Sequence, residues 1–296
     1  MKIRLAAIDS KMVNVAILKI AQYHINIGDQ VKWYEPLFDL NIDKLYISKI
    51  FSFSEDLNYL PQCKIIKGGT GYDIKSKLDD EIENITDVRK AYELLYPNCD
   101  YSIQFTTRGC VRNCNFCLVR QKEGLIYDVP MLTLNPNGKY IKVMDNNFFS
   151  SETWKTRLDN LKSYNQYLDF NQGIDIRTIT EEQAKALGEC KIKRIHIAWD
   201  NINDEVQVLK GIEILTKYIK SYKLNCYVLV GFKSARILEE DLYRVKKLDS
   251  MGIDPFAMGY IDYNNSKFKK TKQIKDFCRY VNHKAIFRTC EWNEYN

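Results

Sequence analysis

The sequence contains no long run of apolar residues. Cys226–Phe232 is among its longest, and it falls well short of the roughly eighteen residues that a membrane-spanning helix needs. Near the start, Asp9 interrupts the apolar residues too early for the core of a signal peptide. We therefore expect no membrane partner and a cytoplasmic location.

The sequence also lacks a large excess of either positive or negative charge. The 296 residues include 44 Lys and Arg against 38 Asp and Glu, a net charge of +6. This balance permits a nucleic-acid or phosphorylated substrate but does not require one. Hydrophobic residues at 45% and charged residues at 28% are ordinary for a globular enzyme, and the length suits one large domain or two modest ones.

Histidine is scarce, with three residues, whereas cysteine is not, with nine. In a chain that is not expected to be exported, thiols stay reduced and are available as ligands. Three of them, Cys110, Cys114 and Cys117, have C-x3-C-x2-C spacing. Three thiolates on one short loop can bind three corners of an iron–sulfur cube, which usually takes four cysteines. The fourth iron would then stay open for a ligand, as the open position of a catalytic zinc does.

Two other interpretations of the cysteines remain open. A zinc site would need Cys99 or a distant residue as fourth ligand, and zinc sites usually combine two C-x2-C units or add a Cys/His pair. A disulfide cluster conflicts with the expected reducing compartment.

The motif, together with Phe116 just before its last cysteine, resembles the signature loop of the radical SAM superfamily. The resemblance implies a [4Fe-4S] cluster on Cys110, Cys114 and Cys117, with S-adenosylmethionine (SAM) on the open iron. It further implies an electron donor of the flavodoxin or ferredoxin type and a 5'-deoxyadenosyl radical that attacks a substrate. The sequence does not identify this substrate; a nucleic acid or nucleoside is one class that it permits.

The first ninety-odd residues read as a small α/β layer. Hydrophobic patterns predict strands at 2–9, 31–34, 44–51 and 63–67 and a helix at 13–27. This order predicts a flavodoxin-like parallel sheet. A further helix is expected near 86–95, and we place the domain boundary so that residues 1–96 form the first domain and its linker.

This first domain resembles the cobalamin-binding domain of one radical SAM subgroup. The cobalt-ligating D-x-H-x-x-G motif of that subgroup is absent, because the loop Asp9–Asn14 carries no histidine. His24 lies within the predicted helix, where we expect a structural role. The pair Gly68-Gly69 fits either the glycine turn of the subgroup or a plain turn. We do not expect cobalamin to bind, although it stays open as an alternative.

In residues 97–296, strand-like runs alternate regularly with amphipathic helices. The pattern repeats every 24–35 residues, which is the length of a βα unit. Six such units are too few for a closed eight-unit barrel. They resemble the partial (βα)6 TIM-type barrel of the radical SAM family. The predicted strands are Ser102–Thr106, Tyr140–Met144, Phe170–Ile176, Arg194–Trp199, Cys226–Phe232 and Pro255–Ile261.

Alternation within two of these strands predicts which face lines the barrel, because successive side chains of a strand point to opposite faces. In the third strand the apolar residues are Ile174 and Ile176, and in the fourth they are Ile195, Ile197 and Trp199. The opposite, polar set should face the barrel interior: Gly173, Asp175, Arg177, His196, Ala198 and Asp200.

The resemblance also implies roles beyond the cluster. Phe116 is expected against the adenine or the cluster, and Gly231 where adenine approaches the backbone. Asp145, Asn146 and Asn147 follow the second strand, where the family binds the amino group of SAM; an ordinary turn with a helix N-cap is the alternative.

Arg177 and the neighbouring Asp175 are expected at the cofactor, where a guanidinium can pair with the SAM carboxylate. A salt bridge from Arg177 to Asp175 or Asp200 is the alternative. Asp200, Tyr260 and Asp262 lie where substrate would sit, and we assign them to catalysis.

Two other functions remain open. One is a cobalamin-dependent radical SAM methyltransferase. The other is a non-catalytic, metal-stapled nucleic-acid-binding module, for which the five lysines between 267 and 275 would form the contact surface.

Overall fold

The computed structural model describes residues 1–234, 236–263, 265 and 268–295. The chain packs into two compact units. The first contains residues 1–105 and 129–141, and the second contains 106–128 and 142–296. The chain therefore passes between the units three times, at 105/106, 128/129 and 141/142. The single boundary after residue 96 stays a prediction for how the protein divides into domains.

The first unit is built on a four-stranded parallel sheet with the order β2-β1-β3-β4. The predicted parallel α/β layer is thus confirmed, with strand ends that differ by a few residues. The strands are β1 (Lys2–Ala7), β2 (Gln30–Trp33), β3 (Lys44–Ser48) and β4 (Lys64–Gly68).

Three helices accompany this sheet: α1 (Val15–Asn26), α2 (Asp80–Glu83) and α3 (Arg89–Leu95). Asn14 caps α1 by accepting a hydrogen bond from Ile17 N at 3.1 Å. His24 in α1 is 1% exposed, and its ring nitrogens contact Asp29 Oδ2 at 2.7 Å and Tyr46 Oη at 3.0 Å. Both nitrogens thus have protein partners, which fits the structural role expected of His24.

Residues 129–141 belong to the first unit through specific hydrogen bonds. Thr133 N donates to Thr86 O, and Thr133 Oγ1 accepts from Val88 N, both at 2.9 Å. Leu132 N donates to Gln104 Oε1 at 3.0 Å. This segment therefore completes the packing around α3 and β5.

The larger sheet is a six-stranded parallel sheet whose strands follow the order β12-β11-β10-β9-β8-β5. Its strands occur across the sheet in the same order as along the chain. They are β5 (Tyr101–Gln104), β8 (Tyr140–Val143), β9 (Tyr167–Phe170), β10 (Ile192–Ala198), β11 (Leu224–Val230) and β12 (Asp254–Gly259).

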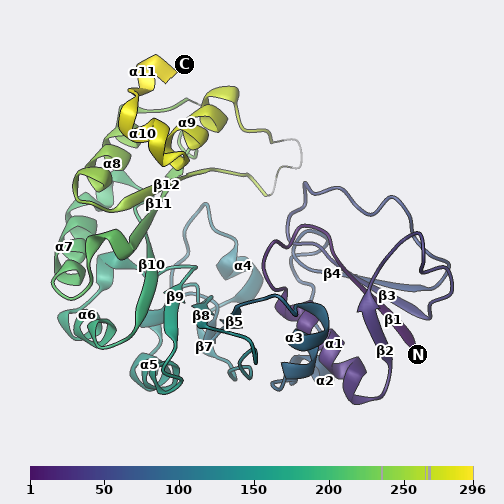
Figure 1. The fold of residues 1–296 in the computed structure, drawn as a ribbon. Helices are drawn as coiled ribbons and strands as arrows, with labels where there is room; N and C mark the ends of the chain where they lie inside the picture. Colours follow the sequence, from purple (N-terminus) through teal and green to yellow (C-terminus); the bar gives the residue numbers. More distant parts are fainter. Residues whose placement is uncertain (235, 264, 266–267, 296) are drawn as a thin grey trace. The chain divides into compact units, whose positions relative to one another are not determined.

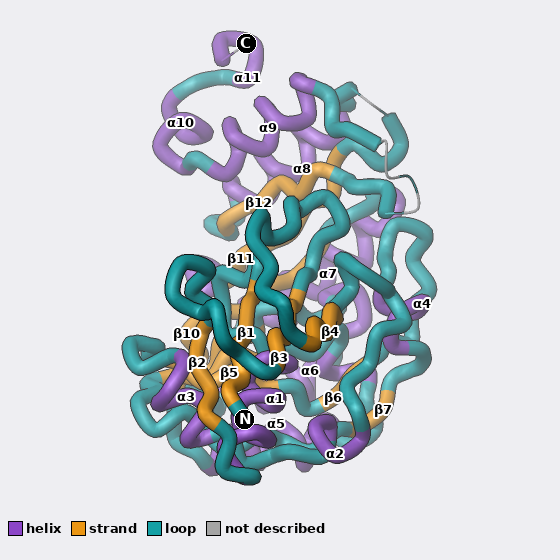
Figure 2. The backbone as a smooth tube through the Cα atoms, turned by 90° about the vertical axis from the view of Figure 1, so that its right-hand side faces the viewer, coloured by secondary structure: helices purple, strands orange, loops and turns teal. Residues whose placement is uncertain are grey.

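Helices cover one side of these strands in the second unit. Figure 1 shows α6, α7 and α8 along the outer side of the arc formed by β9 to β12, and Figure 2 shows them from a second direction. The helices of this unit are α4 (Val119–Glu123), α5 (Trp154–Ser163), α6 (Glu181–Gly188), α7 (Glu205–Thr216), α8 (Glu239–Ser250), α9 (Lys272–Asn282), α10 (Lys284–Thr289) and α11 (Trp292–Tyr295). In the described part of the chain, no helix combines the length and the apolar character that crossing a membrane requires.

The alternation predicted for the fourth strand is confirmed in β10. Ile195, Ile197 and Trp199 are each 0% exposed, whereas Ala198 and Asp200 on the opposite face are half-buried. His196, predicted for that same face, is buried as well, at 8% exposed, and its ring stacks on Tyr227. The apolar set therefore packs under the helices, and Asp200 stands on the other face just beyond the strand.

The prediction for the third strand was wrong in its bounds. β9 ends at Phe170, and residues 176–178 form a short 3-10 helix, Ile176–Thr178. Gly173 adopts φ +108°, and a Cβ there would lie 3.0 Å from His196 O, a conformation that breaks the strand. Asp175 accepts a hydrogen bond from Arg177 N and begins the 3-10 helix. Asp175 and Arg177 are hence positioned by a turn, not by strand alternation.

Candidate functional site

The cysteine motif forms a closed loop in the second unit. A short antiparallel pair, β6 (Thr107–Arg108) with β7 (Tyr127–Asp128), joins the two ends of the loop. Cys110 N donates to Gly124 O at 3.3 Å. Gly109 has φ +77°, and a Cβ at this position would lie 2.2 Å from Leu125 O, so only glycine fits where the two ends meet.

Glu123 holds the base of this loop together. Its side chain is 10% exposed and forms an ion pair with Arg108 at 2.7 Å. Oε2 also accepts hydrogen bonds from Gly109 N and from Asn146 Nδ2, each at 2.9 Å. Sequence reasoning gave Glu123 no role, because its partner Asn146 lies 23 residues away and no local pattern marks such a pair.

The three motif thiols lie within electrostatic range of one another. Burial raises the pKa of Cys114, and the nearby Cys117 and Cys110 thiolates raise it further, whereas Arg177 lowers it. The pKa of Cys117, which is more exposed, also rises through desolvation by its neighbours and through repulsion from Cys110 and Asp200. Arg112 N donates a hydrogen bond to Cys110 Sγ at 3.4 Å. All three cysteines are free of disulfides.

No three His, Cys, Asp or Glu side chains of the described residues are grouped so as to hold one metal ion. A cluster that distributes its cysteines over different irons does not need them to converge on one atom. The chemistry of the donor set is consistent with such a cluster. Burial and repulsion by nearby charges disfavour the thiolates of Cys114 and Cys117, and a bound metal would stabilise these thiolates.

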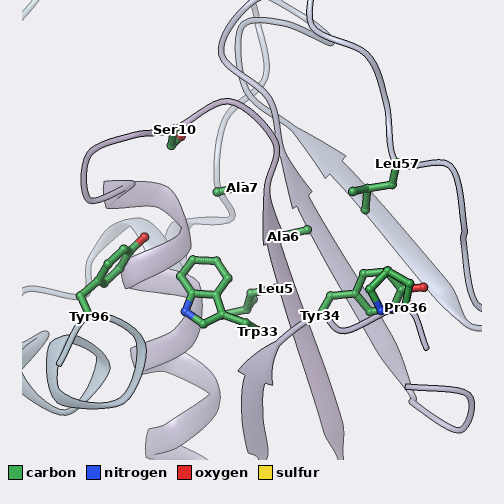
Figure 3. A pocket seen from close by; sticks show the side chains of 9 residues that line it. All are labelled: Leu5, Ala6, Ala7, Ser10, Trp33, Tyr34, Pro36, Leu57 and Tyr96. Carbon is green, nitrogen blue, oxygen red and sulfur yellow. The ribbon is translucent and has the colours of Figure 1, made fainter. Parts of the chain in front are cut away.

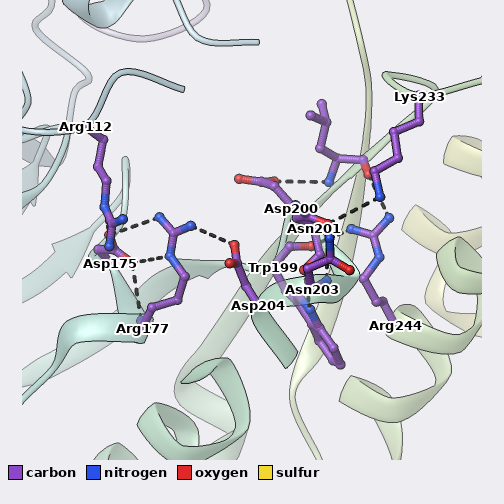
Figure 4. A network of polar contacts seen from close by, with 11 residues as sticks. Arg112, Asp175, Arg177, Trp199, Asp200, Asn201, Asn203, Asp204, Lys233 and Arg244 are labelled. Carbon is purple, nitrogen blue, oxygen red and sulfur yellow. Dashed lines mark hydrogen bonds and ion pairs between the residues drawn. The ribbon is translucent and has the colours of Figure 1, made fainter. Parts of the chain in front are cut away.

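A polar network connects the loop with the ends of β9 and β10 (Figure 4). Arg112 Nε donates to Asp175 Oδ2 at 2.8 Å. Arg177 contacts both oxygens of Asp175, at 2.8 and 3.0 Å, and donates to Asp204 Oδ2 at 2.8 Å. Burial alone would raise the pKa of Asp175, but Arg177 and Arg112 outweigh it and lower this pKa. Hydrogen bonding to Asp175 in turn raises the pKa of Arg177.

Two roles were left open for Arg177, and the structure contains one of them, the salt bridge to Asp175. The second carboxylate that pairs with Arg177 is Asp204, not Asp200. A contact with the SAM carboxylate stays a prediction. Arg112 and Asp204, to which the sequence gave no role, are both part of this network.

Asp200 lies beside the cysteine loop, since its charge acts on both Cys114 and Cys117. Burial raises the pKa of Asp200 to about 6, although Leu229 N donates to its Oδ1 and Arg244 and Arg177 lie near. The side chain of Arg244 is 2% exposed and donates to Trp199 O at 2.6 Å and to Leu229 O at 3.0 Å. Arg244 thereby fixes the ends of β10 and β11 around Asp200.

A row of aromatic rings extends from the loop to the ends of β11 and β12. Phe116 and Phe232 have ring centroids 5.6 Å apart, and Phe232 and Tyr260 are 4.9 Å apart. Gly231 precedes Phe232 with φ +79°, and a Cβ there would lie 2.9 Å from Ile274 Cδ1. The structure thus brings together Phe116, Gly231 and Tyr260, three residues predicted from separate parts of the sequence.

Desolvation raises the pKa of Tyr260, and the charge of Asp262 raises it further, so this carboxylate also lies at the same end of the sheet. Of the five lysines between 267 and 275, Lys267 lies outside the described residues. Lys272 pairs with Asp276 at 2.6 Å on α9.

The segment after β8 contributes structure to the loop. Asp145 is 1% exposed, and its carboxylate accepts four hydrogen bonds, from the backbone N–H and the hydroxyl of both Thr106 and Thr107. Burial raises its pKa despite these bonds. Asn146 contacts Glu123, and Asn147 O accepts from Ser150 N at 3.1 Å at the start of the 3-10 helix Phe148–Ser150.

The turn expected as the alternative at Asn147 is therefore present, without a side-chain cap. The side-chain oxygens of Asp145 are already engaged by Thr106 and Thr107, and the contact of this segment with the amino group of SAM stays a prediction.

No family model matches the chain, and a comparison with curated proteins finds no match.

Proposed function

We propose that this protein is a radical SAM enzyme. The observation that carries the proposal is the closed three-cysteine loop of the second unit, which Asp175, Arg177, Asp200, Phe232 and Tyr260 approach from the ends of successive strands. The cysteine motif and these polar and aromatic residues lie at the carboxyl ends of parallel strands. This is where α/β folds usually bind their ligands.

The fold supports the finer architecture that we propose. Six parallel strands in chain order with helices on one side are what a partial (βα)6 TIM-type barrel requires. The order β2-β1-β3-β4 of the first unit matches the beginning of the flavodoxin-like order.

Cys110, Cys114 and Cys117 would hold the [4Fe-4S] cluster. When bound, a cluster with SAM on its open iron supplies reductive cleavage of the sulfonium and a 5'-deoxyadenosyl radical. The N–H of Arg112 already donates to Cys110 Sγ, and such bonds to sulfur tune cluster potential.

The remaining residues would orient the reactants and control protons. Phe116 and Phe232 offer ring faces for the adenine. The Asp175–Arg177–Asp204 network keeps a guanidinium at the loop in a fixed orientation. Asp200 has a pKa of about 6, so its carboxyl group can hold or release a proton near neutral pH.

We further propose an electron donor of the flavodoxin or ferredoxin type, a cytoplasmic location and a substrate such as a nucleic acid or nucleoside. Cobalamin is not part of the proposal, because His24 already has two protein partners and the Asp9–Asn14 loop carries no histidine.

The test is anaerobic reconstitution with iron and sulfide, reduction with dithionite, and measurement of 5'-deoxyadenosine formed from SAM. Cys114→Ala should abolish both the cluster absorbance and the product. Cys190→Ala is the matched control, because Cys190 is also a half-buried thiol of the second unit outside the loop, and it should retain both.

The proposal fails if the reconstituted protein holds no cluster, or if a reduced cluster neither cleaves SAM nor changes its spectrum when SAM is added. Salt-sensitive RNA or DNA binding together with that failure would favour the metal-stapled binding module. Turnover that depends on added cobalamin would favour the methyltransferase.

A further inference from the structure

The first unit contains a pocket of its own at the carboxyl ends of β1 and β2. The pocket has a volume of about 300 Å³. Figure 3 shows the rings of Trp33, Tyr34 and Tyr96 around small side chains from the end of β1. Its lining contains no charged side chain and consists of Leu5, Ala6, Ala7, Ser10, Trp33, Tyr34, Pro36, Leu57 and Tyr96.

The backbone of Ala7 faces β2 without a partner there. In the parallel ladder, Met1 O and Leu5 O accept from residues on the β2 side, Gln30 N and Tyr34 N. Ile8 N donates to Ser48 O on the β3 side. Because the direction of backbone groups alternates along a strand, the N–H and C=O of Ala7 point to the β2 side.

The ladder cannot continue to Ala7 because of the residue that follows β2. The next donor toward Ala7 O would be residue 36, and Pro36 has no N–H. Glu35 N instead donates to Asp39 Oδ2 at 2.8 Å. Among the described residues, none forms a hydrogen bond with the N–H or the C=O of Ala7. An unused donor and an unused acceptor thus stand side by side at the wall of the pocket.

We propose that this pocket binds a nucleobase, with the ring among the aromatic side chains and its hydrogen-bonding edge on Ala7. The volume is near the lower end for ligand pockets, about 300 to 1,000 Å³, which suits one base and part of its sugar. The uncharged lining favours a neutral ring. Each of the four bases presents an adjacent donor and acceptor on its pairing edge, which complements the pair offered by one strand residue.

This inference does not depend on the proposed radical chemistry, because every residue that carries it belongs to the first unit. The base could come from a free nucleoside or from a single strand of nucleic acid, since both present the same ring and edge.

The indole N–H resonances of the four tryptophans provide a local test. Trp33 lines the pocket and donates from Nε1 to Leu95 O at 3.0 Å. We would titrate the ¹⁵N-labelled protein with adenosine, cytidine, guanosine and uridine, with ribose as the blank, and in a second arm with a short single-stranded RNA. Trp33→Phe assigns the signal. We expect at least one nucleoside, or the RNA, to shift the Trp33 signal saturably.

Two variants that fill the pocket test whether the shift of the Trp33 signal arises from binding in this pocket. Ala7→Leu keeps the backbone groups but occupies the space from β1, and Leu57→Phe fills it from a loop, where a larger side chain is more easily accommodated. Each folded variant should bind at least tenfold more weakly. Tyr222→Ala removes an exposed tyrosine of the second unit (69% exposed) and should bind as the wild type does.

The proposal is overturned if neither the nucleosides at millimolar concentration nor the RNA move the Trp33 signal, or if the shift survives unchanged in the folded pocket-filling variants. A nucleoside that shifts only the tryptophans of the second unit would also overturn it, and would direct attention to the SAM site.

Discussion

The carboxylate of Asp145 accepts hydrogen bonds from Thr106 N at 2.7 Å and from Thr106 Oγ1 at 2.6 Å, although 39 residues separate the two along the chain. Thr107 donates to the same carboxylate in the same manner. The chain enters the cysteine loop directly after these threonines. Asp145, two residues after the end of β8, therefore sets the position from which the loop begins.

Asp145→Asn should weaken this attachment. The amide of asparagine retains one acceptor oxygen, but its two N–H donors would face the donors of the threonines. A buried donor without an acceptor costs about 1–3 kcal/mol. We expect the free energy of unfolding to fall by about 2 kcal/mol, and reconstituted iron per protein to fall with it. Urea unfolding and iron analysis measure both. Asp159→Asn, an exposed change on α5, is the control, and equal behaviour of the two variants would contradict the role of Asp145.

Two glycines of the loop base form a matched pair. Gly109 and Gly124 both have positive φ, +77° and +79°, but an added Cβ would collide with Leu125 O only at Gly109 and meets open space at Gly124. Gly124→Ala should cost about 1–3 kcal/mol of conformational strain, because φ +79° with ψ −151° is a backbone conformation that essentially only glycine adopts. This variant should still load iron. Gly109→Ala should lose most iron loading, because the loop cannot close. If the two variants load equally, the loop does not need this close approach.

Asp200 should make stability depend on pH. Its folded pKa of about 6 lies above the ordinary 3.8, so the folded state favours the protonated form. The protonated carboxyl group of Asp200 therefore contributes to the free energy of unfolding. This contribution is complete below pH 3.8 and is lost as the pH rises through about 6. In metal-free protein, Asp200→Asn should become more stable than the wild type across this window, by up to about 3 kcal/mol at a conversion of about 1.4 kcal/mol per pKa unit.

The difference between the two unfolding free energies, followed from pH 4 to pH 8, is the measurement, because acid effects common to both proteins cancel. A flat difference would show that Asp200 titrates normally in the folded protein.

Alkylation should report which thiols the cluster occupies. Before reconstitution, iodoacetamide should modify Cys114 slowly at neutral pH, because its raised pKa leaves little thiolate. After reconstitution, mass spectrometry should find Cys110, Cys114 and Cys117 protected, while Cys99 and Cys290 react as before. Protection of Cys99 together with the three would favour the zinc alternative, and no protection at all would argue against metal binding.

The sequence predicted the strands where hydrophobic alternation was strong. β10 and β11 lie close to where they were expected, because Ile195 and Ile197 are fully buried while Ala198 and Asp200 on the opposite face are only half-buried. The third strand was placed too late, because Ile174 and Ile176 alternate as strand residues do, although Gly173 turns the chain between β9 and the 3-10 helix.

At the site, the residue types and their convergence could be predicted better than the individual contacts. Spacing alone marked the three cysteines. Asp145 and Glu123 each bind partners that lie far away along the chain. The buried Arg244 binds backbone carbonyls at strand ends. No local motif encodes such contacts, so they become visible only in the fold.

The passage of residues 129–141 back to the first unit has a consequence for synthesis. The first unit cannot be completed until residue 141 has left the ribosome, by which time the whole cysteine loop has already been made. The two units are therefore not exchangeable modules: no single cut yields both intact, and a graft of either one would need two or more junctions.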